Sequence, residues 1–166
     1  ILGLGGSMRY NCGVNQYTEK QMRQRVQKLR FKIWRSGGID ILMTHSPARS
    51  LGDDTDLAHT GFQTFLDVME KYRPRYMVHG HVHQNYQYNF KRVRHHGDTT
   101  VINAFGYYLL DIPVTEIREL TRLNFRFFLA FWRHRFYNME DMRGGLSRVN
   151  LIFTKEISPC RTKVSA

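Results

Sequence analysis

The chain has 166 residues, of which 42% are hydrophobic and 23% are charged, so it is long enough to bury one sizeable core and is expected to form one domain with an extension. This composition excludes disordered and collagen-like chains, and no run approaches the roughly 18 apolar residues that a membrane-spanning helix needs. Lys and Arg number 25 against 14 Asp and Glu, and the resulting net charge of +11 favours polyanionic partners such as nucleic acid, an anionic membrane or a phosphate-bearing substrate.

The first residues, Ile1 to Leu4, read as a strand already in progress, with no initiator Met and no basic stretch of a signal peptide. We therefore expect the chain to be a fragment of a domain whose N-terminal half is missing. The two cysteines, Cys12 and Cys160, stand far apart and lack metal-type spacing, which argues against a disulfide framework. This cysteine usage fits a reducing compartment and predicts a cytoplasmic protein.

The first predicted helix runs from Thr18 to Arg35, where apolar residues recur at helical spacing and Thr18 forms a capping box with Gln21. Its opposite face is dense in Lys and Arg against the single acid Glu19. That face could dock nucleic acid, although such a run usually marks a solvated surface. The mostly apolar run from Ile39 to Thr44 then predicts a buried strand.

A second helix and a second strand follow after a polar loop. Thr60 and Gln63 repeat the capping-box spacing before a helix that is expected to end near Tyr72. Arg75 to Val78 reads as another strand. The alternation of helix and strand predicts an α/β fold in which the loops at the carboxyl ends of the strands build the functional site.

Beyond residue 85 the pattern changes to β hairpins, with predicted strands at Tyr86 to Val93, Thr99 to Asn103 and Gly106 to Ile112. His95 and His96 are expected in a turn between two of these strands. We expect residues 1–112 to form the domain and residues 113–166 to form a C-terminal extension that is helical and then irregular.

The extension contains a basic, aromatic segment from Ile117 to Tyr137. As a helix this segment has an unusually wide apolar arc, so we expect it to pack on the domain or on a missing part of the protein. Insertion into an anionic membrane interface and stacking on nucleic acid are the alternatives.

Histidines follow two of the predicted strands. His45 comes after the first, and His81 and His83 come after the second, two residues apart so that they project in a similar direction in extended chain. Imidazole is the commonest protein ligand for borderline transition metals, and Gly80 allows the sharp departure from the strand that would aim the two side chains. A single such histidine is usually a hydrogen-bonded loop side chain, but three that converge predict a metal site.

His45-Ser46-Pro47 and Gly80-His81-Val82-His83 resemble, in order and spacing, the His-x-Pro and Gly-His-x-His motifs of the calcineurin-like metallophosphoesterases. The glycine-rich opening at residues 3–10 and the loop at residues 52–62 also look like members of that family. The resemblance covers about residues 1–112. It implies an α/β fold, here the C-terminal portion of a four-layer α/β/β/α metallophosphoesterase sandwich.

The resemblance also implies a chemistry. Two divalent or trivalent transition metal ions (manganese, iron or zinc) clamp a phosphate ester and lower the pKa of a bridging water, so that hydroxide attacks phosphorus. The family's equivalents of His45 and His81 bind one metal, and that of His83 binds the other. The remaining ligands and the acid come from Asp-x-His, Gly-Asp-x-x-Asp and Asn-His motifs, and none of these stands in its proper place in this chain. The fragment alone is therefore expected to be inactive and to hold no catalytic residue of its own.

Residues 52–56 match Gly-Asp-x-x-Asp literally, but they follow the His-x-Pro loop instead of preceding it. We therefore interpret this acidic segment as a solvated loop. His59 is expected either to cap the second helix or to face the cleft, and Arg9 is a candidate contact of the substrate phosphate. These two residues are the expected substrate-binding side chains.

The sequence thus predicts a metal-dependent phosphoesterase acting on a phosphomonoester or a phosphodiester. One alternative is a noncatalytic module of the same fold that binds a protein or nucleic-acid partner. Another is a basic nucleic-acid-binding protein in which the histidines are incidental. The three missing motifs, if they precede Ile1, would separate the enzyme from the noncatalytic module.

Overall fold

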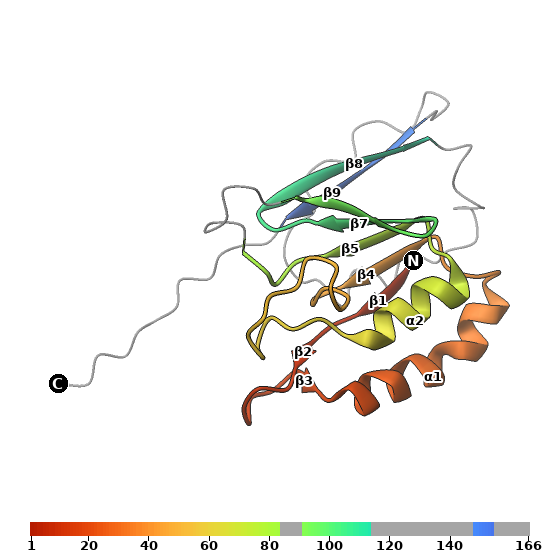
Figure 1. Ribbon diagram of the computed structural model, residues 1–166. Helices are drawn as coiled ribbons and strands as arrows, with labels where there is room; N and C mark the ends of the chain where they lie inside the picture. Colours follow the sequence, from red (N-terminus) through yellow and green to blue (C-terminus); the bar gives the residue numbers. More distant parts are fainter. Residues whose placement is uncertain (84–90, 114–147, 155–166) are drawn as a thin grey trace. The chain divides into compact units, whose positions relative to one another are not determined.

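The computed structural model describes residues 1–83, 91–113 and 148–154 (Figure 1). The chain divides into two compact units, Ile1–Phe105 and Gly106–Ala166. The first unit contains β1 (Leu2–Leu4), β2 (Ser7–Met8), β3 (Gln16–Tyr17), α1 (Glu19–Arg35), β4 (Ile41–Thr44), α2 (Gln63–Tyr72), β5 (Tyr76–His79), β6 (Val93–His96) and β7 (Thr99–Asn103). The second contains β8 (Tyr107–Pro113) and β9 (Arg148–Thr154).

A five-stranded sheet forms the centre of the first unit, with the strand order β1-β4-β5-β7-β6. The first four of these strands run parallel, and β6 pairs antiparallel with β7. The fold is therefore mixed α/β with a mostly parallel sheet and two helices, as the alternation of helix and strand predicts. Because β1, β4, β5 and β7 are parallel, their carboxyl ends meet at one edge of the sheet.

The β6–β7 hairpin corrects the prediction for His95 and His96, which lie in strand β6 and not in a turn. His96 pairs with Thr99, so only Gly97 and Asp98 remain to make the turn. Gly97 has a φ of 54°, which glycine adopts without steric cost. Most of the predicted strand at Tyr86 to Val93 lies outside the described residues.

The hydrophobic core lies between the sheet and the two helices, which cover one of its faces (Figure 1). Helix α1 buries Met22, Val26 and Ile33, the positions that its apolar periodicity predicts. Helix α2 buries the apolar residues Phe65, Val68 and Met69. The central strands add buried side chains between them, among them Leu42, Met77 and Val101.

The two helix starts differ from each other. Thr18 caps α1, and its capping box with Gln21 is confirmed by a hydrogen bond in each direction. The capping box predicted for Thr60 and Gln63 is wrong, because the N-cap of α2 is Phe62 and makes no side-chain capping bond. Thr60 instead donates its hydroxyl to the carbonyl of Asp56.

The side chain of Glu19, the first residue of α1, accepts hydrogen bonds from the first residues of α2. Its carboxylate accepts hydrogen bonds from the backbone N–H of Gln63 (3.1 Å) and of Thr64 (2.6 Å), and also from the Thr64 hydroxyl. These are the first N–H groups of the helix, which have no partner within it. One helix thus caps the other across 44 residues of sequence.

In the second unit, β8 and β9 form an antiparallel pair that runs from Tyr107 opposite Thr154 to Pro113 opposite Arg148. Strand β8 agrees with the strand predicted at Gly106 to Ile112. Strand β9 lies in the extension, where the sequence predicts helix and then irregular chain. The predicted helix at Ile117 to Tyr137 lies outside the described residues.

Candidate functional site at the carboxyl edge of the sheet

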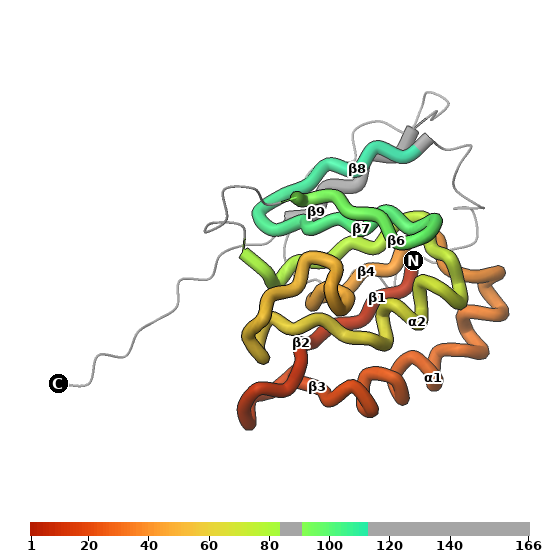
Figure 2. The backbone as a smooth tube through the Cα atoms, viewed as in Figure 1, coloured from red at the N-terminus to blue at the C-terminus, as the bar shows by residue number. Residues whose placement is uncertain are grey.

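The residues that follow two neighbouring parallel strands, β4 and β5, lie together at the carboxyl edge of the sheet. His45 follows β4, and Gly80 and His81 follow β5, which pairs with β4. The backbone ties these ends together, since the N–H of Gly80 donates to the carbonyl of His45 (3.1 Å) and the N–H of His45 donates to the carbonyl of Leu4 (3.2 Å). Figure 2 shows the segment after β4 and the residues after β5 at the same end of the sheet.

The structure brings three imidazole rings together at this edge. The ring centroids of His45 and His81 are 4.6 Å apart, and those of His59 and His81 are 4.9 Å apart. The sequence predicts a cluster of His45, His81 and His83, so the pairing of the first two agrees with it. His59 is the third ring of the observed group, which we call the histidine cluster (His45, His59 and His81). His83 stacks on Phe105, with ring centroids 4.3 Å apart.

His81 has an unusual backbone. Its φ is 68°, a left-handed conformation that costs a residue with a side chain roughly 1–2 kcal/mol. The sequence predicts that Gly80 makes the turn away from the strand, but the left-handed residue is the histidine after it. The turn is closed by a hydrogen bond from the N–H of Val82 to the carbonyl of Gly80 (2.8 Å).

The tautomer of His81 follows from its partner. Its Nε2 atom lies 2.8 Å from the carbonyl oxygen of Ala58, and a carbonyl oxygen only accepts hydrogen bonds. Nε2 of His81 therefore carries a proton, and in the neutral ring Nδ1 has the lone pair. Any metal ion or proton that neutral His81 accepts must be taken at Nδ1.

His59 is oriented by a carboxylate in its own loop. Its Nδ1 atom lies 2.7 Å from Oδ2 of Asp56, and the other carboxylate oxygen of Asp56 accepts the backbone N–H of Ala58 and of His59. The hydrogen bond from the His59 side chain lowers the pKa of Asp56, so this carboxyl is ionised at neutral pH. The predicted capping role of His59 is wrong, because the N-cap of α2 is Phe62, and the ring of His59 contacts that of His81 instead.

The acidic loop that contains these residues is held by local hydrogen bonds. Oδ1 of Asp54 accepts the N–H of Thr55 (2.7 Å), and Oδ2 of Asp53 accepts the N–H of Gly61 (3.1 Å). The loop is closed at its base where Arg49 and Phe62 are joined by a backbone hydrogen bond. The carboxylates of Asp53, Asp54 and Asp56 are thus engaged in shaping the loop.

Two buried polar side chains contact the backbone on either side of His81, since the Nδ1 atom of His79 lies 3.1 Å from the carbonyl oxygen of Gly80 and Asn103 binds Val82. His79 is 3% exposed, and burial lowers its pKa to about 4, so it is neutral at physiological pH. Asn103, 2% exposed at the end of β7, donates to the carbonyl of Val82 (3.0 Å) and accepts from the N–H of Phe105 (2.8 Å). Asn103 therefore anchors the turn that carries His81, a role for which the sequence gives no signal beyond its position at a strand end.

Arg9, the other predicted substrate contact, has its partner on α1. Its guanidinium donates to the side-chain oxygen of Gln21 (3.2 Å), and its backbone N–H donates to the carbonyl of Tyr17. Within the described residues, no group of three or more His, Cys, Asp or Glu side chains has an arrangement that would hold a metal ion. No helix in the described part of the chain is long and apolar enough to cross a membrane.

Comparison with known proteins identifies one partial relative. A UPF0046 protein of Caenorhabditis elegans is 39% identical to this chain over 90 residues, which cover 49% of the chain and 30% of that protein. The chain thus spans less than a third of this relative's length, and the relative's name states no activity. No family model and no solved structure matches the chain.

Proposed function

We propose that this chain is part of a metal-dependent phosphoesterase that hydrolyses a phosphomonoester or a phosphodiester, and that its sheet and helices belong to a four-layer α/β/β/α metallophosphoesterase sandwich. The observation that carries the proposal is the pairing of His45 with His81, whose ring centroids are 4.6 Å apart. These residues belong to the His-x-Pro and Gly-His-x-His motifs, and they meet at the carboxyl edge of a parallel sheet, where α/β proteins place their sites.

The donor set at this edge fits transition-metal ions in part. Imidazole nitrogen suits iron and zinc, whereas manganese would depend more on oxygen ligands, and His81 would offer Nδ1 because its Nε2 donates to Ala58. In this proposal His45 and His81 hold one ion and His83 holds a second. The described residues do not complete either ligand set, since no carboxylate joins the histidines in a metal-binding group. When bound, such ions would supply positive charge to the phosphate and acidify a water molecule.

The residues of the chain have separate roles in this proposal. His59 contacts His81 and is held by the ionised Asp56, so it is the side chain at this edge that is suited to bind a phosphate oxygen or to move a proton. Arg9, which follows strand β2, is bound to Gln21 of α1 and would contact the substrate phosphate in this proposal. His79 and Asn103 keep the turn in place and do not touch the substrate.

The metal-binding part of the proposal is tested with Co²⁺, whose visible absorption reports nitrogen ligands. The 166-residue chain is expected to bind Co²⁺ weakly through histidine, and His45→Ala or His81→Ala should remove the absorption. His95→Ala is the matched control, because His95 is an exposed histidine on strand β6. Equal losses in all three variants would show general destabilisation and contradict the assignment.

Hydrolysis is measured with bis(p-nitrophenyl) phosphate and p-nitrophenyl phosphate in the presence of Mn²⁺. We expect no turnover from the 166 residues alone, since none of the Asp-x-His, Gly-Asp-x-x-Asp and Asn-His motifs stands in its proper place in them. We expect turnover from a longer natural form that contains those motifs, and His81→Ala should abolish it. Full activity of His81→Ala in that form would refute the proposal.

A noncatalytic module of the same fold is the second candidate. It is favoured by the incomplete ligand sets among the described residues. This candidate predicts that the longest natural form hydrolyses neither ester and that its stability is unchanged by chelators. The enzyme predicts that EDTA removes turnover and lowers the unfolding temperature of the metal-loaded protein.

A further inference from the structure

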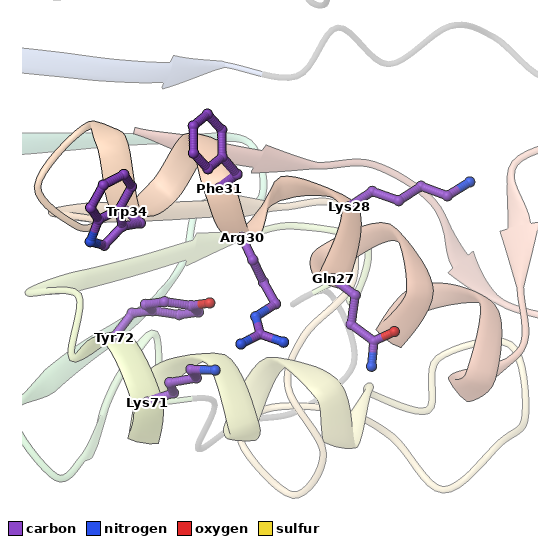
Figure 3. Close-up of a pocket in the computed structure, with 7 residues that line it drawn as sticks. All are labelled: Gln27, Lys28, Arg30, Phe31, Trp34, Lys71 and Tyr72. Carbon is purple, nitrogen blue, oxygen red and sulfur yellow. The ribbon is translucent and has the colours of Figure 1, made fainter.

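A groove lies between helices α1 and α2, on the side of the first unit that the proposed function does not use. It has a volume of about 550 Å³. Its lining comes from the second half of α1 and the last turn of α2, namely Gln27, Lys28, Arg30, Phe31, Trp34, Lys71 and Tyr72. Figure 3 shows Arg30 extending from α1 towards Lys71 and Tyr72 of α2. The lining thus combines three aromatic rings with three cations and contains no acid.

The aromatic part of this lining is exposed to an unusual degree. Phe31 is 66% exposed and Trp34 is 75% exposed, although each is a large apolar side chain. Their rings contact each other, with centroids 5.7 Å apart. They do not serve the core of the first unit, which α1 reaches through Met22, Val26 and Ile33. Large aromatic side chains held in solvent at the wall of a groove indicate a binding surface.

Within the described ranges, the cations of the groove, Lys28, Arg30 and Lys71, form no ion pair with an acid. The carboxylates of α2 are engaged elsewhere, since Asp67 lies 3.8 Å from Arg23 and Glu70 lies 3.7 Å from His96. The single acid of α1, Glu19, is turned to the start of α2. Lys71 lies over the ring of Tyr72, with its Nζ atom 5.4 Å from the ring centroid, so among the described residues the positive charge of the groove is not neutralised by a carboxylate.

We propose that this groove binds single-stranded nucleic acid, with bases stacked on Phe31 and Trp34 and phosphates held by Lys28, Arg30 and Lys71. A charged groove with exposed aromatic rings is the combination by which proteins bind single strands without sequence preference. Further basic residues of α1 lie outside the groove lining, which favours a polyanionic chain over a short acidic peptide: Lys20, Lys32 and Arg35.

Binding is measured by fluorescence anisotropy of labelled oligothymidylate with the 166-residue chain. Because each base–aromatic contact is worth about 1–3 kcal/mol, Trp34→Ala is expected to weaken binding by about tenfold. Arg30→Gln with Lys71→Gln should lower the slope of log K against log salt by about 1.4 in magnitude, since each lost phosphate contact removes about 0.7. Arg49→Gln with Lys91→Gln removes the same charge outside the groove and should have the smaller effect.

Stacking is tested separately by tryptophan emission. The chain has two tryptophans, so Trp132→Phe leaves Trp34 as the only one. Oligothymidylate is expected to quench Trp34 in this variant, with the same dependence on salt as the anisotropy. Equal weakening in the groove and control pairs, with no quenching of Trp34, would overturn the proposal. A blue shift of Trp34 emission with phosphatidylserine vesicles, together with no response to oligothymidylate, would overturn the proposal in favour of a membrane surface. Displacement of bound oligothymidylate by polyglutamate at equal charge concentration would overturn it in favour of an acidic protein.

Discussion

The capping of α2 by Glu19 gives a sharp test of how the two helices stabilise each other. Glu19→Ala removes an acceptor from two backbone N–H groups and one hydroxyl, those of Gln63 and Thr64. Loss of a helix cap costs about 0.5–2 kcal/mol, and hydrogen bonds to a charged group contribute about 1.5–3 kcal/mol. Since water can replace part of this at a half-buried position, we expect the free energy of unfolding to fall by about 2–3 kcal/mol.

Urea denaturation followed by circular dichroism measures this effect. With a slope near 2 kcal/mol per molar, the midpoint for Glu19→Ala should fall by about 1 M. Glu19→Gln retains one oxygen acceptor and should lose about half as much. Glu70→Ala is the control, because this exposed acid has one partner, His96 at 3.7 Å, and such pairs contribute less than about 1 kcal/mol.

A double-mutant cycle of Glu19→Ala with Thr64→Val isolates the contact between the two helices. The cycle should give a coupling energy of about 1 kcal/mol, because both variants remove the same side-chain hydrogen bond. The reasoning is refuted if Glu19→Ala and Glu70→Ala have the same midpoint. A cycle without coupling would show that the hydrogen bond from the Thr64 hydroxyl to Glu19 contributes nothing to stability, which contradicts its assigned part in the cap.

Three further predictions concern the residues that shape the histidine cluster. Gly61→Ala should destabilise the fold by about 2–3 kcal/mol, because a Cβ atom at position 61 would lie 2.4 Å from the backbone carbonyl of Ala48. Gly3→Ala is the control, because a Cβ atom at position 3 would meet nothing within 4 Å and should change stability little. Thermal unfolding of the two variants measures the difference. Burial lowers the pKa of His79 from 6.5 to about 4, so as the pH falls His79 is protonated in the unfolded chain before it is protonated in the folded one. The free energy of unfolding should therefore fall by about 3 kcal/mol between pH 7 and pH 4. His79→Gln should flatten this part of the pH profile of stability, and an unchanged profile would contradict the prediction. His81→Gly should be more stable than His81→Ala by about 1 kcal/mol in urea denaturation, because glycine adopts a φ of 68° without steric strain and alanine does not. Equal stability of the two variants would contradict backbone strain at this position.

The fold class could be predicted from the sequence because its signals are local. The apolar spacing of α1 and the Thr18–Gln21 capping box each lie within a few residues, and the structure confirms both. The start of α2 could not be predicted in the same way. Thr60 and Gln63 have the spacing of a capping box, but the helix is capped by Glu19, which is distant in sequence and is brought near only by the packing of α1 on α2. A pattern of near neighbours carries no information about such a partner.

The candidate site likewise has one part that could be predicted from the sequence and one part that could not. His45 and His81 are placed by the ends of two parallel strands, so their proximity follows from the strand order. His59 reaches the same place from a long loop, and its position depends on Asp56 and on the backbone pairing of Arg49 with Phe62. The topology of the sheet does not fix such a loop, which explains why the sequence left the placement of His59 open.

The backbone of His81 gives a physical argument for function that is independent of sequence motifs. A left-handed residue is accommodated at no steric cost by glycine, and Gly80 stands directly before it without taking that conformation. The strain at His81 is instead held by its own side chain, through the hydrogen bond to Ala58 and the contacts with the rings of His45 and His59. Strained conformations of this kind persist where the surrounding structure fixes them, and they concentrate at functional sites. In the function proposed above, this strain is offset because the imidazole at position 81 supplies a metal ligand that glycine cannot supply.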